Sequence, residues 1–152
     1  MGDKVLIFGA AGSIGSELVR QLYKKYVIYA VDQNETGVND LYVDYKVVGR
    51  VGDIRDYDTV NDVFSDFKPH LVMHAAAYKH VTPMELYPEE AVSTNINGTL
   101  NVLKCAKNLE CVEKFVFIST DKVIHSNSVM GATKRVGEIM VKNSGKGFVV
   151  VR

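Results

Sequence analysis

A glycine-rich segment near the N-terminus constrains the fold more than any other feature of the chain. Gly9, Gly12 and Gly15 recur at every third position, after an apolar run at residues 4–8 and before helical apolar spacing at residues 13–25. Glycines let backbone N–H groups approach a pyrophosphate closely, and the following helix N-terminus adds partial positive charge. The segment therefore predicts a strand–loop–helix unit that binds a dinucleotide rather than a purely structural turn, with Ser13 and Ile14 as further contacts.

A second sequence signal, an acidic residue, follows the glycine loop. Asp32 ends an expected strand at residues 27–31, about 20 residues beyond the glycines, where an acid can bind the ribose 2′-hydroxyl. A 2′-phosphate there would meet repulsion of about 4 kcal/mol per charge pair at about 4 Å, so NAD is favoured and NADP stays open. The alternative is that Asp32 only caps the next helix. Asp53 and Ile54 could bracket the adenine, although Gly-Asp is also ordinary turn chemistry.

The rest of the chain alternates between strand-like and helix-like segments. Further strands are expected at residues 46–51, 71–74, 114–119 and 147–152, and helices at 34–45, from Asp56 to 67, at 88–108 and at 129–142, with a long loop at 75–87. This order predicts an α/β fold, a doubly wound parallel sheet of the Rossmann type with helices on both faces. Residues 1–152 form one NAD(P)-binding domain in this interpretation. It is truncated at the sixth strand, with the C-terminal substrate domain absent.

Composition excludes several classes of partner. Lys plus Arg and Asp plus Glu each number 18, so we expect no nucleic-acid binding. The sequence shows neither a secretory leader nor an apolar run of membrane-spanning length, which favours a cytoplasmic protein with no membrane segment in this chain. Cys105 and Cys111 are expected to be reduced thiols, and no Cys/His cluster has the spacing of a metal site.

Several later motifs narrow the interpretation further. They are His-Ala-Ala-Ala-Tyr-Lys-His-Val at 74–81, Pro-Met-Glu at 83–85, Thr-Asn at 94–95, Asn-Gly-Thr at 97–99, Ser-Thr-Asp-Lys at 119–122 and Val-Met-Gly-Ala-Thr-Lys-Arg at 129–135. With the glycine loop, the chain resembles the extended short-chain dehydrogenase/reductase family. Within it, the motifs resemble the polysaccharide-biosynthesis branch, the UDP-N-acetylglucosamine 4,6-dehydratases. The resemblance covers nearly the whole chain.

The catalytic motif of that superfamily, Tyr-x-x-x-Lys, is altered here. Its tyrosine position is Met130, four residues before Lys134, and a thioether cannot exchange a proton. The resemblance implies that the proton chemistry moves to Thr120, Asp121 and Lys122. In that scheme Lys122 removes the C5 proton, Asp121 protonates the departing C6 hydroxyl, and Thr120 with Lys134 holds the C4 oxygen. The alternative for Asp121 and Lys122 is a solvated loop pair. A 4-epimerase or 4-reductase, or a non-catalytic dinucleotide-binding module, also stays open.

The resemblance also implies contacts around the nicotinamide and the nucleotide-sugar substrate. Ala75, Ala76 and Ala77 would line the nicotinamide side. Lys79, His80 and Glu85 would touch the nucleotide sugar, although an ordinary loop histidine is an equal alternative for His80. Pairing of exposed helices in such domains leads us to expect a homo-oligomer.

Overall fold

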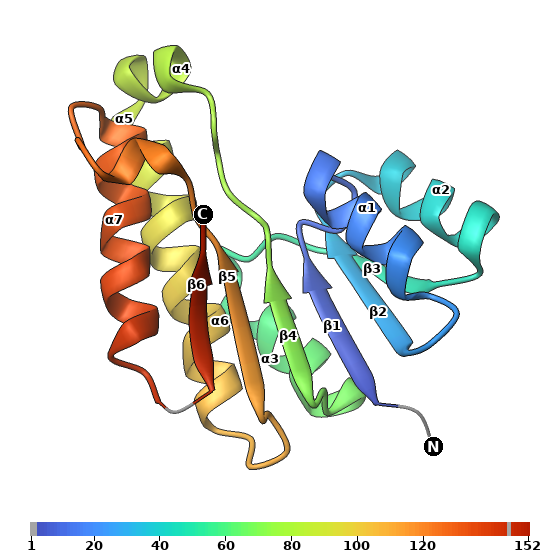
Figure 1. Cartoon of the computed structure of the whole chain (residues 1–152). Coiled ribbons are helices and arrows are strands. Elements are labelled where there is room, and N and C mark those ends of the chain that lie inside the picture. The colour runs from blue at the N-terminus through green and yellow to red at the C-terminus, as the bar shows by residue number, and fades with distance from the viewer. Residues whose placement is uncertain (1–2, 146) are drawn as a thin grey trace.

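The computed structural model describes residues 3–145 and 147–152. Its centre is a six-stranded parallel sheet in the order β3-β2-β1-β4-β5-β6 (Figure 1). The strands are β1 (Lys4–Phe8), β2 (Val27–Asp32), β3 (Val48–Val51), β4 (Leu71–His74), β5 (Lys114–Ile118) and β6 (Phe148–Val151). The predicted doubly wound Rossmann sheet is therefore confirmed, and every expected strand is present.

Helices cover both faces of this sheet. The α-helices of the described residues are α1 (Ser13–Leu22), α2 (Glu35–Tyr45), α3 (Tyr57–Phe67), α4 (Val81–Leu86), α5 (Pro88–Ala91), α6 (Thr99–Lys107) and α7 (Val129–Lys142), of which α4 and α5 pack on α7. In Figure 1, α1 and α2 lie on one side of the sheet, and α3, α6 and α7 lie on the other. Alternate side chains of β1 point to separate cores, with Val5 and Ile7 in one and Leu6 and Phe8 in the other. Among the described residues no helix is long and apolar enough to span a membrane.

Local capping explains where two of the helices begin. The Asp56 carboxylate accepts hydrogen bonds from the N–H groups of Asp58 and Thr59, as expected for the start of α3. Asn34 caps α2 by accepting from the Gly37 N–H. The alternative that Asp32 is the cap of this helix is therefore wrong.

The segment between β4 and α6 differs from the prediction. We expected a loop from 75 to 87, but residues 81–86 form α4, whose Met84 is buried against Met130 and Ala91. The expected single helix from 88 to 108 starts at Pro88 but is interrupted by a π-helical stretch, Val92–Gly98, before α6. Apolar spacing does not distinguish an i→i+5 turn from an i→i+4 turn, so the sequence could not reveal this stretch.

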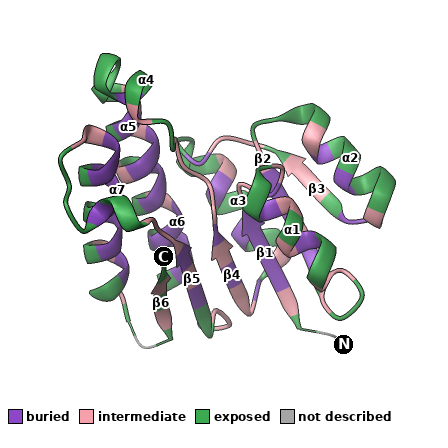
Figure 2. Ribbon diagram, turned by 45° about the horizontal axis from the view of Figure 1, so that its top comes forward, coloured by how far each residue is buried: buried purple, intermediate pink, exposed green. Residues whose placement is uncertain are grey.

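The sheet is covered unevenly. On the face of α1 and α2, helix contacts reach β1, β2 and β3, whereas β6 presents Val149 and Val151 outward, 48% and 47% exposed (Figure 2). On the opposite face Phe148 and Val150 pack on the core. Within the described residues, β1 is therefore buried on both faces, β4 is only half-buried on the α1–α2 side, and the β6 edge is exposed on that side.

His74, the last residue of β4, is a fully buried polar group in the core. Its Nε2 lies 2.9 Å from the Thr99 hydroxyl, and the rings of Phe8, Phe115 and Phe117 surround it. Burial, with a smaller contribution from the charge of Lys134, lowers the pKa of His74 from 6.5 to about 3. The imidazole is therefore neutral in the folded protein at pH 7.

This buried histidine predicts a loss of stability in mild acid. Its pKa is lower in the folded state, so below pH 6.5 the unfolded chain binds the extra proton and folding is penalised. Lowering the pH from 7 to 5 should cost about 2 kcal/mol of the free energy of unfolding through this group. Urea denaturation of the wild-type chain and of His74→Phe at both pH values measures this change in the free energy of unfolding. An equal pH dependence in both proteins would contradict the assignment.

Candidate functional site

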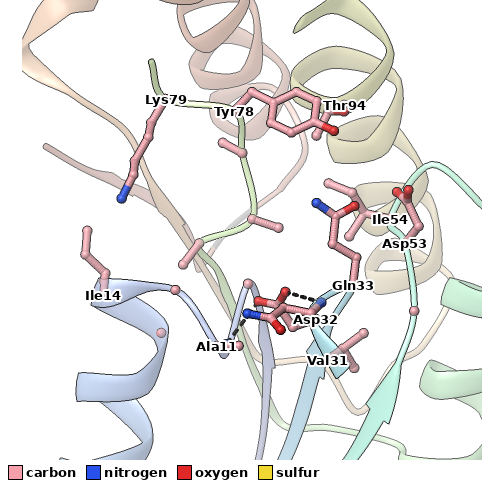
Figure 3. A pocket seen from close by; sticks show the side chains of 18 of the residues that line it. Ala11, Ile14, Val31, Asp32, Gln33, Asp53, Ile54, Tyr78, Lys79 and Thr94 are labelled. Atoms are coloured by element: carbon pink, nitrogen blue, oxygen red, sulfur yellow. Dashed lines mark hydrogen bonds between the residues drawn. The ribbon is translucent and has the colours of Figure 1, made fainter. Parts of the chain in front are cut away.

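Two neighbouring cavities open at the carboxyl ends of the strands, where the strand order reverses between β1 and β4. Open α/β sheets place ligands at this switch point. The glycine-loop cavity, of about 270 Å³, is drawn in Figure 3. The lysine cavity, of about 330 Å³, adjoins it. The two share five lining residues, which are Ile14, Ala75, Ala77, Tyr78 and Lys79.

Two of the three loop glycines are required by the protein itself. Gly9 has a φ of 75°, and a Cβ there would lie 2.5 Å from the backbone nitrogen of Ala76. A Cβ at Gly15 would lie 2.0 Å from the Gly9 carbonyl oxygen. Such contacts with backbone cannot be relieved by a side-chain movement. Gly9 and Gly15 thus allow β1, the loop, α1 and the segment after β4 to pack closely.

Gly12 is different because the protein leaves space beside it. A Cβ there would meet only the Gly9 oxygen, at 3.3 Å, and Gly12 lines the glycine-loop cavity. It is also the N-cap of α1 and has no side chain to bind the free N–H groups of the first turn. Ser13, Ile14 and Gly15 line the cavity at this helix end. These groups fit an anionic ligand such as a pyrophosphate.

Asp32 fastens the loop and also faces the cavity. Its Oδ2 accepts a hydrogen bond from the Ala11 N–H at 3.0 Å and its Oδ1 accepts one from the Asn34 N–H at 2.9 Å (Figure 3). Asp32 lines the cavity, as predicted for the residue that receives a ribose hydroxyl. Each carboxylate oxygen has a second lone pair, so both backbone bonds are compatible with ligand binding.

Asp53 and Ile54 lie at the far wall of the same cavity. The Arg55 Nε donates to the Asp53 carboxylate at 2.7 Å. Burial alone would raise the pKa of Asp53, but the hydrogen bonds and charge of Arg55 lower it below its usual value. Ile54 is buried under Gly98, where a Cβ would lie 2.6 Å from its Cδ1. Both residues line the cavity, and their place at the adenine end stays a prediction.

Thr94 is a cavity residue to which the sequence interpretation gave no role. It lies in the π-helical stretch and is only 8% exposed, yet its hydroxyl has no hydrogen-bond partner among the described residues. A buried polar group without a partner is costly unless a ligand or water satisfies it. Since Thr94 lines the glycine-loop cavity, its hydroxyl also fits a polar ligand there. The π-helical geometry that directs the Thr94 side chain toward the cavity could not be recognised from the sequence.

The lysine cavity contains most of the predicted catalytic residues. Beyond the shared residues, its lining consists of His80, Ile118, Ser119, Thr120, Lys122, Met130 and Lys134. No carboxylate is among these lining residues of the described chain. Met130 and Lys134 lie one turn apart on α7, both nearly buried, as the spacing of four predicts. The cavity is therefore cationic and suits an anionic or electron-rich ligand.

Lys134 is held by contacts from β5. Its ammonium donates to the Ile118 carbonyl and lies 4.0 Å from the centroid of the Phe117 ring. Burial lowers the pKa of Lys134 from 10.5 to about 8, against the opposing effect of the Glu138 charge. A fraction of Lys134 is therefore neutral near pH 8, which is the range in which a lysine can exchange protons.

The Thr120–Lys122 segment divides between the cavity and solvent. Thr120 and Lys122 line the lysine cavity, but the Asp121 side chain is 83% exposed and lies outside it. The Thr120 hydroxyl donates to Asp121 at 3.0 Å and the Lys122 ammonium is 3.6 Å away. Both partners lower the pKa of Asp121. In this arrangement Asp121 belongs to the solvated loop pair that the sequence interpretation left open.

The three residues predicted to touch the sugar separate in the structure. Lys79 and His80 line the lysine cavity. Glu85 lines neither cavity, and its Oε1 accepts a hydrogen bond from the Val129 N–H at 2.6 Å. Glu85 thus ties α4 to the first turn of α7. Any substrate contact by Glu85 would compete with this bond.

Comparison with known proteins places these features in a family. A family model described as "Polysaccharide biosynthesis protein" matches residues 5–152. The chain is 41% identical, over 99% of its length, to the probable polysaccharide biosynthesis protein EpsC of Bacillus subtilis. It is 40% identical, over 97% of its length, to the capsular polysaccharide biosynthesis protein CapD of Staphylococcus aureus. It spans 27% of the length of each of these relatives.

A solved structure of known function has the same fold as this chain. The UDP-glucose 4-epimerase of Thermus thermophilus, determined in complex with NAD, superposes with a TM-score of 0.83 at 28% identity. The match covers 95% of this chain and 51% of the epimerase chain.

Proposed function

Because the chain belongs to the polysaccharide biosynthesis protein family, we propose that it is the NAD-binding part of a nucleotide-sugar 4,6-dehydratase. One observation carries the proposal: the cavity lined by the glycine loop and Asp32 shares a wall with a cationic cavity containing Lys122, Lys134 and Met130. Methionine where the superfamily has its catalytic tyrosine favours the dehydratase branch over the epimerases that the chain also resembles. The substrate would be UDP-N-acetylglucosamine or a similar nucleotide sugar.

The glycine-loop cavity supports NAD as the cofactor. Gly12 and the first turn of α1 would bind the pyrophosphate, Asp32 the adenosine ribose and the Asp53–Ile54 wall the adenine. Ala75, Ala76 and Ala77 are small enough to let the nicotinamide lie at the boundary with the lysine cavity. When bound, NAD supplies a hydride acceptor that later returns the hydride. The NAD complex of the epimerase that this chain resembles further supports this choice.

The residues of the lysine cavity support an internal redox dehydration. The Thr120 hydroxyl and Lys134 would bind the C4 oxygen, and the neutral form of Lys134 would take up the C4 hydroxyl proton as C4 becomes a ketone. Lys134 would also contact the nicotinamide ribose. Lys122 would remove the C5 proton, which is acidic once C4 is a ketone, and would return it to C5 after the C6 hydroxyl has left. Asp121 would protonate the leaving C6 hydroxyl, which requires its side chain to turn inward and gain a proton, because it now lies outside and its pKa is lowered. Met130 would line the cavity without exchanging a proton.

Product analysis tests this function against the second candidate. The full-length protein is incubated with UDP-N-acetylglucosamine and NAD, and the products are analysed by mass spectrometry. A dehydratase yields a product lighter by one water, whereas a 4-epimerase, the activity of the structural relative, yields an isomer of equal mass. An isomer alone would overturn the dehydratase assignment. Absence of both products would favour a non-catalytic dinucleotide-binding module.

We further propose that a domain outside these 152 residues binds most of the nucleotide sugar, because the chain spans 27% of the length of two relatives. In the same assay the 152-residue chain should bind NAD and form little or no product. Turnover by this chain at the rate of the full-length protein would contradict the proposal.

Asp32→Asn should weaken NAD binding and reduce the preference for NAD over NADP. The amide has a single acceptor oxygen, so it cannot hold Ala11, Asn34 and a ribose hydroxyl as the carboxylate can. We expect the affinity for NAD to fall by about tenfold, and NADP to lose less because a charge repulsion is removed. Calorimetric titration of both cofactors measures this, with Asp62→Asn on the exposed face of α3 as a control. Unchanged NAD affinity in Asp32→Asn would contradict this role.

A further inference from the structure

The ammonium of Lys134 is held in the lysine cavity without a carboxylate partner. Among the described residues it forms no ion pair, and its only hydrogen-bond acceptor is the Ile118 carbonyl. The buried carboxylate of Glu138, one turn away, is already engaged by Arg152 at 2.8 Å and Arg135 at 3.0 Å. A buried lysine with so few partners needs another source of stabilisation.

That source is the face of the Phe117 ring. The Lys134 Nζ lies 4.0 Å from its centroid, well inside the range of a cation–π interaction, and both side chains are buried. The ring is fixed from two further sides. A Cβ at Gly137 would lie 2.7 Å from its Cζ, and the His74 ring centroid is 5.5 Å from its own. Only glycine at 137 leaves room for the ring in this position.

This arrangement differs chemically from an ion pair. A carboxylate would hold Lys134 but would also occupy its N–H groups and neutralise its charge. The ring attracts the ammonium through its π electrons and covers only one side of the ammonium group. Lys134 has three N–H donors, and the Ile118 carbonyl accepts from one of them, which leaves donors for cofactor and substrate in the cavity.

We propose that Phe117 is a positioning residue for Lys134. The buried Phe117 ring holds the Lys134 ammonium at the wall of the lysine cavity and leaves a hydrogen-bond donor for the ligand. The inference rests on the proposed function in one respect, that Lys134 contacts cofactor and substrate. Other groups also act on Lys134. The charged and titratable groups around it are Glu138 of α7 with its partners Arg135 and Arg152, His74 of β4, and Lys79 and Lys122 of the same cavity. A test must therefore change the ring alone.

A nuclear magnetic resonance titration of the chain provides that test. The ¹³Cε shift of Lys134, assigned with Lys134→Gln, is followed against pH in the wild type, Phe117→Leu and Phe115→Leu. Phe115 is a matched control, because it is equally buried two residues away on β5 and also contacts His74. Loss of the ring face should lower the pKa of Lys134 by about 0.4 to 1.5 units in Phe117→Leu and leave it within about 0.2 units in Phe115→Leu. An unchanged or raised pKa in Phe117→Leu, or an equal change in both variants, overturns the proposal.

A second variant keeps the test decisive if Phe117→Leu does not fold. Incorporation of 3,5-difluorophenylalanine at position 117 preserves the ring and its contact with Gly137 but withdraws electron density from its face. The pKa of Lys134 should again fall, by less than in Phe117→Leu, and an unchanged pKa overturns the proposal. The titration requires no turnover. Failure of the dehydratase assay would therefore leave the Phe117 result intact, and failure of the titration would leave the dehydratase proposal intact.

Discussion

Gly12→Ala is expected to leave the fold intact and to lower the affinity for NAD by roughly ten- to a hundredfold. The added methyl group meets one protein atom, the Gly9 oxygen at 3.3 Å, so the loop can accept it with a small shift. It would, however, project at the cavity wall where the pyrophosphate must approach the backbone N–H groups of α1. Calorimetry for NAD binding and thermal denaturation for stability measure the two effects separately.

Gly15→Ala is the matched contrast. Its methyl carbon would lie 2.0 Å from the Gly9 oxygen and 2.7 Å from the Ala10 Cα, both backbone atoms that cannot turn away. We expect a loss of stability on the order of 3 kcal/mol or more, together with loss of binding. Normal affinity in Gly12→Ala, or normal stability in Gly15→Ala, would contradict the division of the three glycines into packing and ligand-approach positions.

Lys122→Ala in the full-length protein is expected to reduce dehydration by about a hundred- to ten-thousandfold, the contribution of a positioned general base. The loss should appear in kcat, with KM much less affected, because in the proposed mechanism the lysine acts on the C5 proton during the reaction. Lys122 lines the cavity and its side chain is 55% exposed, so its truncation should not disturb folding. Steady-state kinetics with product detection by mass spectrometry measures the effect.

Lys114→Ala is a suitable control, because Lys114 is an exposed residue at the start of β5, at the opposite end of that strand from Lys122. Asp121→Asn belongs in the same series. Dehydratase activity retained in both Lys122→Ala and Asp121→Asn would remove the assignment of proton chemistry to this segment. Activity lost only in Lys122→Ala would leave the departing hydroxyl to an acid other than Asp121.

The sheet and the phosphate loop could be predicted because both depend on local sequence. The apolar runs gave all six strands, and the glycine spacing gave the loop between β1 and α1. The orientation of individual side chains was harder to predict from the sequence. Nothing in Ser-Thr-Asp-Lys distinguishes Lys122, which faces the cavity, from Asp121, which faces solvent, because the 3₁₀ turn Asp121–Val123 decides this.

Contacts between distant segments were not predictable from a single sequence. Glu85 was assigned to the sugar, whereas its carboxylate binds the Val129 N–H on another helix. The unsatisfied hydroxyl of Thr94 follows from a π-helical stretch that apolar spacing does not reveal. The ring of Phe117 beneath Lys134 depends on strand, helix and Gly137 meeting in three dimensions.

The uneven cover of the sheet has a consequence for the motions of the two cavities. Opening free energies are highest for strands buried on both faces and lowest at half-covered edges. Amide hydrogen exchange should therefore be slowest in β1 and progressively faster through β4 and β5 to β6. The glycine loop extends from the slowest-exchanging strand, whereas Thr120 and Lys122 extend from β5, beside the edge. On this basis we expect the part of the lysine cavity that would hold the proposed sugar to move more readily than the glycine loop.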